Sequence, residues 1–164
     1  ELLDDNNQPV KAGEPGEVTI TTLGVEAMPL LRYKTGDICI SFEDPCSCGR
    51  SSLRLSPLLG RKKQMIKFKG TTLYPPALFD LLNEMEEVDD FVAEVYSNEV
   101  GLDEVLLHLQ VANQTKESDG KIRAYLQARL RVIPQVKYVS KQEMQQLQFP
   151  ETGRKAVRFI DRRS

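Results

Sequence analysis

The hydrophobic positions in the second half of the chain repeat with two different periods. After the pair Pro75-Pro76 the hydrophobic residues recur every three or four positions, which predicts a helix with one apolar stripe. The stripe consists of Leu78, Leu81, Leu82 and Met85. Residues 91–97 and 105–111 instead alternate apolar and polar positions around a short polar link that contains a glycine, so they predict an antiparallel pair of strands.

A second helix and two short strands complete this pattern. Another apolar stripe begins near Ser118 and stops before Pro134, which predicts a helix. Short strands are expected over residues 65–68 and 136–139. The resulting order, β-α-β-β-α-β, predicts a ferredoxin-like arrangement.

The tail and the single histidine lie outside this pattern. We expect residues 144–163 to form a loop that ends in a short strand over residues 157–160. His108 falls on the polar side of its alternating strand. The alternation therefore predicts a histidine at the surface or between subunits.

Residues 1–59 are predicted to form strands and turns without helices. Residues 16–22 are rich in β-branched side chains and follow a Gly-Glu-Pro-Gly turn, and residues 37–42 alternate polar and apolar positions. Two or three strands without covering elements are marginally stable. We therefore expect a β-rich piece of a larger domain, and the fold class of the whole chain is predicted to be α+β.

Composition narrows the function classes. The chain has 164 residues, 40% of them hydrophobic and 28% charged, with a net charge of -2, as in an ordinary globular protein. The lack of basic excess argues against nucleic acid, and no apolar run approaches the roughly 20 residues of a membrane span. The start lacks Met and a signal-peptide pattern, as a piece excised from a longer protein would. Three cysteines, an odd number, favour a reducing compartment, which predicts a cytoplasmic protein.

Two residues are suited to a nucleotide. The Asp37 carboxylate, after Thr35-Gly36, can accept both hydroxyls of a ribose, and Arg61 presents a fork of donors that suits ribose and phosphate oxygens. Each also has an ordinary explanation, because Thr-Gly-Asp can be a plain turn and a Gly-Arg-Lys-Lys run can be a solvated basic loop. Both explanations stay open on the residues alone.

Two further lysines, Lys155 and Lys69, are candidates for contacts with a ligand. Lys155 lies in a polar loop, where a cation could neutralise charge that develops on a phosphate and a carboxylate, although most lone lysines are simply solvated. Lys69-Gly70 ends a predicted strand, and the glycine either admits a ligand close to the backbone or merely closes a turn.

Cys46 and Cys48 form a Cys-x-Cys pair. Two thiolates are half of a tetrahedral zinc site, and the other ligands would have to come from outside this chain. The alternative is two ordinary reduced cysteines.

Four groups of segments together resemble a known enzyme superfamily. They are Arg32-Tyr33-Lys34-Thr35-Gly36-Asp37; Gly60-Arg61-Lys62-Lys63-Gln64, continuing to Lys69-Gly70; Gly153-Arg154-Lys155-Ala156-Val157-Arg158; and Pro45-Cys46-Ser47-Cys48-Gly49-Arg50 with Glu26-Ala27-Met28-Pro29 and Tyr74-Pro75. The first three resemble the nucleotide-binding strand end, the hinge and the catalytic-lysine loop of adenylate-forming enzymes (acyl-CoA synthetases). The fourth group is similar to the phenylacetate-CoA ligases within that superfamily.

The resemblance implies roles for the nucleotide and hinge residues. Asp37 would bind the ATP ribose, with Tyr33 in the same motif, and Arg61 would contact the nucleotide. Lys63 would be the hinge residue, where many members have Asp and others Lys. Gln64 departs from the acid that is frequent at its position.

The resemblance also implies roles for Lys155 and for the pair Lys69-Gly70. Lys155 would be the catalytic lysine, although the glycine of the family's Gly-Lys-x-x-Arg motif is displaced by one residue here. Lys69 and Gly70 would line the pantetheine tunnel and so bind CoA.

By the same resemblance the chain has three parts and a parent enzyme. Residues 1–59 would end a large N-terminal adenylation domain, residues 60–64 would be the hinge, and residues 65–164 would form a ferredoxin-like C-terminal lid. The parent would use ATP, Mg²⁺ and coenzyme A to convert an aryl acid into an acyl-adenylate and then a thioester. The isolated piece, which lacks the phosphate loop and the acid pocket, should be inactive.

Two other functions remain open. The parent could be an adenylating synthetase that does not use CoA, or residues 65–140 could be a regulatory or dimerisation module of the ACT type. A homodimer is compatible with each of these functions, whereas a nucleic-acid or membrane partner is not expected.

Overall fold

The computed structural model describes residues 1–150 and 155–163. Its internal contacts divide the chain into two compact units, unit 1 over Glu1–Met65 and unit 2 from Ile66 onward. Strands dominate unit 1, whereas unit 2 contains strands and α-helices. The predicted α+β class is therefore confirmed.

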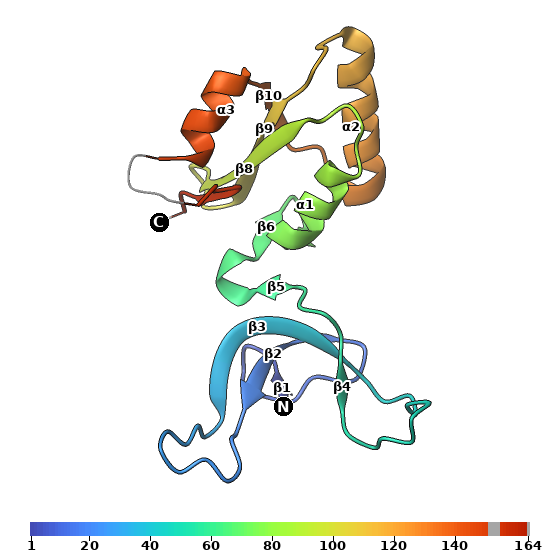
Figure 1. The fold of residues 1–164 in the computed structure, drawn as a ribbon, viewed down its shortest axis with the longest axis vertical. Coiled ribbons are helices and arrows are strands. Elements are labelled where there is room, and N and C mark those ends of the chain that lie inside the picture. Colours follow the sequence, from blue (N-terminus) through green and yellow to red (C-terminus); the bar gives the residue numbers. More distant parts are fainter. Residues whose placement is uncertain (151–154, 164) are drawn as a thin grey trace. The chain divides into compact units, whose positions relative to one another are not determined.

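Unit 1 is built around one sheet. Its strands are β1 (Leu2–Leu3), β2 (Pro15–Ile20), β3 (Tyr33–Phe42), β4 (Arg54–Leu55) and β5 (Gly60–Arg61). They pair in the order β1-β2-β3-β4, and β5 also pairs with β3. Figure 1 shows β3 as the long curved strand at the centre of this unit. One strand thus holds both β2 and β5, and it carries the Thr-Gly-Asp motif.

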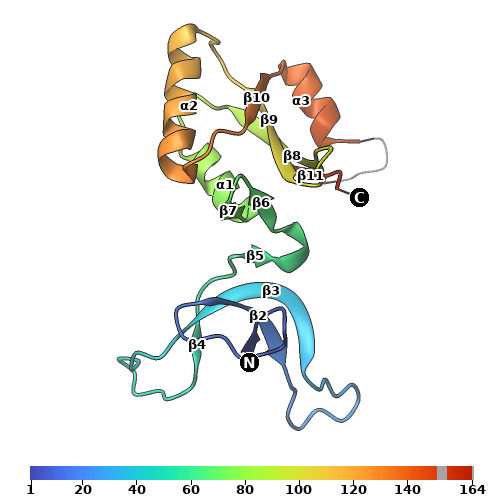
Figure 2. The ribbon, with the colours of Figure 1, turned by 180° about the vertical axis from the view of Figure 1, so that it is seen from behind.

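Unit 2 contains a larger sheet and a separate hairpin. The sheet has the order β10 (Gln135–Tyr138), β9 (Asp103–Gln110), β8 (Asp90–Ser97) and β11 (Phe159–Asp161). The hairpin joins β6 (Ile66–Phe68) and β7 (Thr71–Leu73). The helices are α1 (Pro75–Asn83), α2 (Lys116–Leu130) and α3 (Lys141–Gln148). Figures 1 and 2 show α2 and α3 on opposite sides of the central strands, so both faces of this sheet are covered.

The predicted apolar stripes form the core of unit 2. The antiparallel pairing of β8 with β9 is confirmed, and it sets Phe91 opposite Leu109. Leu82 of α1 and Ile122 of α2 are fully buried in the same cluster. The sequence pattern succeeded here because burial on one face produces the alternation and the stripe that it detects.

The expected ferredoxin-like order is not confirmed. Residues 66–68, the first strand of the predicted fold, pair with β7 instead of joining the larger sheet. β10 accordingly runs parallel to β9 as its direct neighbour. The two-residue turn at Lys69-Gly70 allows the chain to fold back at once, which favours a local hairpin over a distant pairing.

The expected loop over residues 144–163 is wrong in its first part. Helix α3 covers Lys141–Gln148 and begins with a capping box. The Ser140 hydroxyl accepts the Glu143 backbone N–H, and the Glu143 carboxylate accepts the Ser140 N–H. The Ser-x-x-Glu spacing was the signal that could have revealed this helix. The expected terminal strand is present as β11, which runs parallel to β8.

The surface position predicted for His108 is also wrong. The side chain is only 6% exposed, because α3 covers the sheet face on which it lies. Its Nε2 atom lies 2.8 Å from Oε2 of Glu94, whose Oε1 accepts a bond from Arg162. The alternation correctly gave a polar position, but the covering helix was missing from the prediction.

Acid should weaken unit 2 through Glu94. Burial raises the pKa of Glu94, but hydrogen bonds from His108 and Arg162 outweigh it and hold the pKa below its ordinary 4.5. The ionised carboxylate therefore stabilises the folded unit above pH 4.5, and this contribution is lost as pH falls through the lowered value. We expect Glu94→Gln to remove about 1–3 kcal/mol near neutral pH and to flatten the acid dependence.

Amide hydrogen exchange in β8 and β9, corrected for the intrinsic effect of pH, measures this change. Glu99→Gln, on the exposed turn between the two strands, is the matched control and should behave as wild type. An acid dependence in Glu94→Gln as steep as in wild type would refute this role for Glu94.

None of the helices in the described part of the chain has the length and apolar character needed to cross a bilayer.

Candidate nucleotide site

Strand pairing brings Asp37 and Arg61 to opposite positions. β5 runs antiparallel to β3, and the register sets Asp37 directly across from Arg61. The Nε atom of Arg61 lies 3.5 Å from Oδ1 of Asp37. The Arg61 side chain is 72% exposed and that of Asp37 is 26% exposed. A carboxylate and a guanidinium thus lie side by side at the surface. The carboxylate can accept hydrogen bonds from ligand hydroxyls, and the guanidinium can donate to ligand oxygens.

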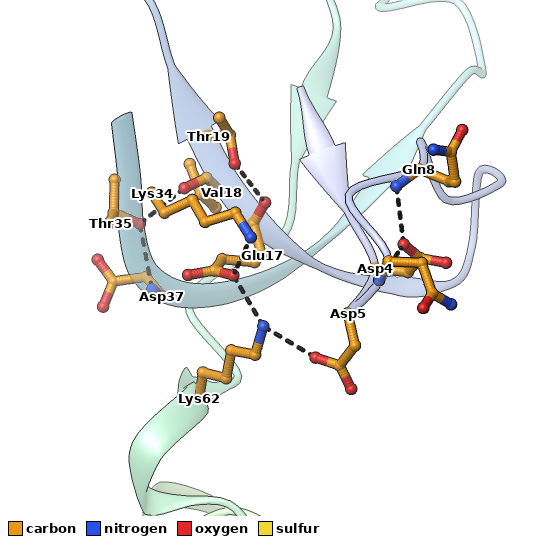
Figure 3. A network of polar contacts seen from close by, with 11 residues as sticks. Asp4, Asp5, Gln8, Glu17, Val18, Thr19, Lys34, Thr35, Asp37 and Lys62 are labelled. Atoms are coloured by element: carbon orange, nitrogen blue, oxygen red, sulfur yellow. Dashed lines mark hydrogen bonds and ion pairs between the residues drawn. The ribbon is translucent and has the colours of Figure 1, made fainter. Parts of the chain in front are cut away.

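A bulge in β3 fixes the Asp37 backbone. The register between β2 and β3 shifts here, so that residues 35–37 lie opposite a single residue of β2. Gly36 has a φ of 78°, which favours glycine. The Thr35 hydroxyl donates to the Val18 carbonyl at 3.0 Å and accepts the Asp37 N–H at 3.1 Å (Figure 3). The turn predicted before the strand is therefore a bulge inside it, a feature common beside functional sites.

Tyr33 begins strand β3 and pairs with Ile20 of β2. Its side chain is 52% exposed. The tyrosine thus lies on the strand that carries Asp37, and its ring is accessible to a ligand.

Lys62 is anchored to unit 1 by two carboxylates. Its Nζ atom lies 2.9 Å from Oε2 of Glu17 and 2.8 Å from Oδ1 of Asp5 (Figure 3). Lys34 approaches the same Glu17 oxygen at 3.7 Å. Glu17 is 7% exposed, so its charge depends on these ammonium groups. Hydrogen bonds to Asp5 and then Glu17 raise the pKa of Lys62 above its ordinary 10.5.

Lys62→Met should loosen the sheet of unit 1. It would leave the buried Glu17 carboxylate with only the longer contact to Lys34, at a cost of about 1–3 kcal/mol in local opening free energy. The stabilisation from Lys62 is present below pH 10.5 and is lost as pH rises through its elevated pKa. Amide exchange in β2 and β3 measures the opening.

Lys34→Met is the matched control, because its contact to Glu17 is longer and 40% of its side chain is exposed. We expect a smaller loss there. Adding Glu17→Gln to Lys62→Met should recover part of the stability, since the uncompensated charge is then gone. Equal effects of the two lysine variants would contradict this assignment.

Lys63 lies in the middle of a single 3₁₀ turn, η1 (Lys62–Gln64). The turn follows β5 directly and closes with the Met65 N–H donating to the Lys62 carbonyl at 3.2 Å. Lys63 is exposed, and the boundary between the two units follows Met65. Single 3₁₀ turns are frequent as connectors between elements, and this one lies directly before the boundary between the two units.

Lys69 and Gly70 form the two-residue turn of the β6–β7 hairpin. Their φ angles are 47° and 81°, as a type I′ turn requires. A Cβ atom at Gly70 would meet nothing within 4 Å. The turn alone accounts for the glycine, which is the second of the two explanations open from sequence.

Lys155 lies just before β11 with its side chain exposed. Backbone bonds hold the chain between Lys155 and β11: the Val157 N–H donates to the Gln148 carbonyl at 2.8 Å, and the Arg158 carbonyl accepts the Ala93 N–H at 2.9 Å. Gly153 and Arg154 of the predicted motif lie outside the described residues.

Arg158, the last residue of the motif, is fixed to β8. Its guanidinium carbon lies 4.9 Å from the centre of the Phe91 ring, and its Nη2 atom lies 3.4 Å from Oδ1 of Asp90. The two motif residues therefore differ, because the arginine is held by the sheet while the lysine side chain extends into solvent.

Cys46 and Cys48 lie in the loop between β3 and β4 with their Sγ atoms 3.0 Å apart. The hydrogen bond from the Cys46 thiol, joined by the Arg50 N–H, holds the pKa of Cys48 below its ordinary 9.0. No group of three or more metal-binding side chains occurs in the residues that the structure describes. Two thiolates are half of what a tetrahedral zinc site needs, and the described residues do not supply the other half.

Comparison with known proteins shows what the chain is similar to. No family model matches the chain. It is 38% identical over 113 residues to the phenylacetate-coenzyme A ligase of Thermus thermophilus and 30% identical over 110 residues to that of Escherichia coli. The chain is thus similar to one part of the phenylacetate-CoA ligase family. These matches cover 68% and 67% of the chain but 25% and 24% of the two relatives, so the chain spans about a quarter of the length of each ligase.

The fold agrees with that family. A solved 2-hydroxyisobutyryl-CoA ligase, in the postadenylation state and in complex with R3-HIB-AMP, matches 98% of the chain and 35% of its own length. The TM-score is 0.73 and the identity is 24%, so this likeness shows the fold alone.

Sequence reasoning missed the support that Glu17 and Lys62 give to unit 1. The available signal was a charged residue within the predicted strand over residues 16–22. A carboxylate that becomes buried requires cationic partners. Lys34 and Lys62, which lie beside the two nucleotide motifs, were candidates for that role.

Proposed function

We propose that the chain is the C-terminal part of an ATP-dependent aryl-acid CoA ligase that forms an acyl-adenylate and then an acyl-CoA thioester. The observation that carries the proposal is the pairing of Asp37 with Arg61 in a chain similar to one part of the phenylacetate-CoA ligase family. Two residues that the resemblance assigns to one nucleotide are also neighbours in space. If both motifs were merely solvated turns, there would be no reason for Asp37 and Arg61 to lie side by side.

In this proposal Asp37 accepts the two ribose hydroxyls of ATP. Arg61 donates to ribose or phosphate oxygens from the opposite strand, and the ion pair holds both groups in place before the ligand arrives. Tyr33 contributes from the same strand, with its ring accessible. Preorganised charges of this kind lower the free energy lost on binding.

Lys155 is the proposed catalytic residue of adenylation. Its ammonium group would neutralise the charge that develops on the α-phosphate and the acyl carboxylate as pyrophosphate leaves. Mg²⁺ would accompany the ATP phosphates, and no described residue is assigned to it.

The second half-reaction requires a different position of unit 2. We propose that rotation about Lys63 withdraws Lys155 and brings Lys69 and Gly70 to the pantetheine arm of coenzyme A. Hinge residues absorb large changes in φ and ψ, and the single 3₁₀ turn around Lys63 offers such a position.

The same proposal assigns the two units to two domains. Residues 1–59 of unit 1 would end the large N-terminal domain, residues 60–64 would be the hinge, and residues 65–164, which include all of unit 2, would be the lid, a variant of the ferredoxin-like arrangement. Leu23, Met28 and Leu31 are 89%, 74% and 83% exposed in the loop between β2 and β3, which is what a surface covered by the rest of such a domain would show. The separated piece would then be inactive.

Several features of the parent remain part of the proposal. We place the protein in the cytoplasm, and a homodimer is compatible with the fold. Zinc at Cys46 and Cys48 would need further ligands from elsewhere in the parent.

Incubation of the full-length protein with ATP, Mg²⁺ and an aryl acid, with and without coenzyme A, tests the proposal. An acyl-CoA product that needs all components is expected. Release of pyrophosphate without any thioester would point to a synthetase that does not use CoA. Absence of both products would favour a regulatory module for unit 2.

A further inference from the structure

The Cys46–Cys48 pair has the geometry of a reactive dithiol. The two Sγ atoms are 3.0 Å apart, and both cysteines are free thiols. A short turn holds them, because the Gly49 N–H donates to the Cys46 carbonyl at 2.9 Å and Gly49 has a φ of 75°. Bond formation at about 2.05 Å therefore needs a shift of only about 1 Å within one turn.

We propose that Cys46 and Cys48 are a redox modification site, which a low-molecular-weight disulfide such as oxidised glutathione converts into an intraloop disulfide. This proposal concerns the loop between β3 and β4 and is independent of the adenylation chemistry proposed above. It follows from the closeness of the two sulfurs in one turn.

The exchange takes place in two balanced steps. The Cys48 thiolate attacks one sulfur of oxidised glutathione, which breaks that disulfide, releases one glutathione thiolate and leaves glutathione bound to Cys48. Cys46, deprotonated, then attacks Sγ of Cys48 and expels the second glutathione. The protein loses two protons and two electrons, and oxidised glutathione gains them to become two thiols.

Exposure determines which sulfur reacts first. Cys48 is exposed, whereas Cys46 is half-buried, so the oxidant meets Cys48 and the covered neighbour resolves the intermediate. Cys39 lies buried in β3, where burial raises the pKa of its thiol above the ordinary 9.0. The chain therefore contains its own unreactive reference thiol.

The disulfide would modify the loop without stapling the fold. Its ring spans three residues within one turn and links no two elements, and stabilisation by a disulfide grows with the length of the closed loop. Exposed disulfides in small rings are also the more easily reduced kind. A reversible modification is the expected behaviour.

Peptide mapping of the full-length protein, purified with a reductant and a chelator, tests the proposal. After exposure to oxidised glutathione and alkylation under denaturing conditions, the peptide with Cys46 and Cys48 should be two hydrogens lighter and unalkylated. Dithiothreitol should restore alkylation at both positions. Cys39 should be alkylated in every sample.

Single-cysteine variants identify the order of attack. Cys46→Ser should stop at a stable glutathione adduct on Cys48, and Cys48→Ser should give less adduct at the half-buried Cys46. Two alkylated cysteines in oxidised wild type, or a glutathione on each, would refute the proposal. The proposal would also be refuted if one equivalent of added zinc blocked all oxidation, because the two thiols would then be metal ligands.

Discussion

Lys155→Ala is expected to lower the rate of acyl-adenylate formation by about 10²–10³ in the full-length protein, because in the proposed mechanism it removes the cation that neutralises the charge developing on the α-phosphate. The exposed position of Lys155 beside the fixed strand β11 leaves its ammonium group free to reach a ligand. Single-turnover formation of the adenylate from ATP and an aryl acid measures the rate. Thioester formation from a supplied acyl-adenylate should be nearly unchanged, since the proposed mechanism withdraws the lysine in that step.

Lys137→Ala is the matched control, because this lysine is also exposed in unit 2. It should leave both half-reactions at the wild-type rate. Equal losses in the two half-reactions of Lys155→Ala would indicate damage to the unit as a whole, and unchanged adenylation would remove Lys155 from the mechanism.

Asp37→Asn should raise the KM for ATP by about 10-fold to 10²-fold. Hydrogen bonds to a charged group contribute about 1.5–3 kcal/mol, and about 1.4 kcal/mol corresponds to a tenfold change. The amide keeps the size of the side chain but cannot accept two ribose hydroxyls on two equivalent oxygens. Steady-state kinetics with ATP as the varied substrate measures the change.

A double-mutant cycle with Arg61→Ala tests the pairing itself. The two side chains lie 3.5 Å apart, so their effects on the KM for ATP should be non-additive. Glu43→Gln, in the exposed loop after β3, is a control that should not alter this KM. Additive effects, or a change in the KM for the acid alone, would contradict a joint role at the nucleotide.

Much of unit 2 could be predicted from the sequence because its patterns are local. The stripe around Leu82 and the alternation around Phe91 and Leu107 each reflect burial on one side of one element. Helix α3 was missed although its capping box was present at Ser140. Once that helix was absent from the prediction, nothing remained to cover His108, and the histidine was assigned to the surface.

Strand partners were the part that sequence could not determine. The segment at residues 66–68 has the same alternation whether it joins a large sheet or a hairpin, and the Lys69-Gly70 turn decided for the hairpin. The bulge at Gly36 was equally hidden, because a Thr-Gly-Asp turn and a bulge use the same residues.

The candidate site shows the same limit. The sequence singled out Asp37 and Arg61 separately, but only the register of β3 against β5 sets them across from each other. The network of Glu17, Lys34 and Lys62 was not foreseen, since buried ion pairs between distant residues carry no periodic signal. The chemical character of each candidate residue could be predicted from the sequence, whereas the way these residues come together depends on long-range strand pairing.

Acid-dependent exchange of labelled pyrophosphate into ATP by the wild-type, full-length protein tests the central claim most directly. Phenylacetate and a panel of aryl acids should be supplied one at a time, without coenzyme A. We expect exchange that requires both Mg²⁺ and one of these acids. Exchange with none of them, in a protein that still binds ATP, would contradict the assignment of this chain to an aryl-acid adenylating enzyme.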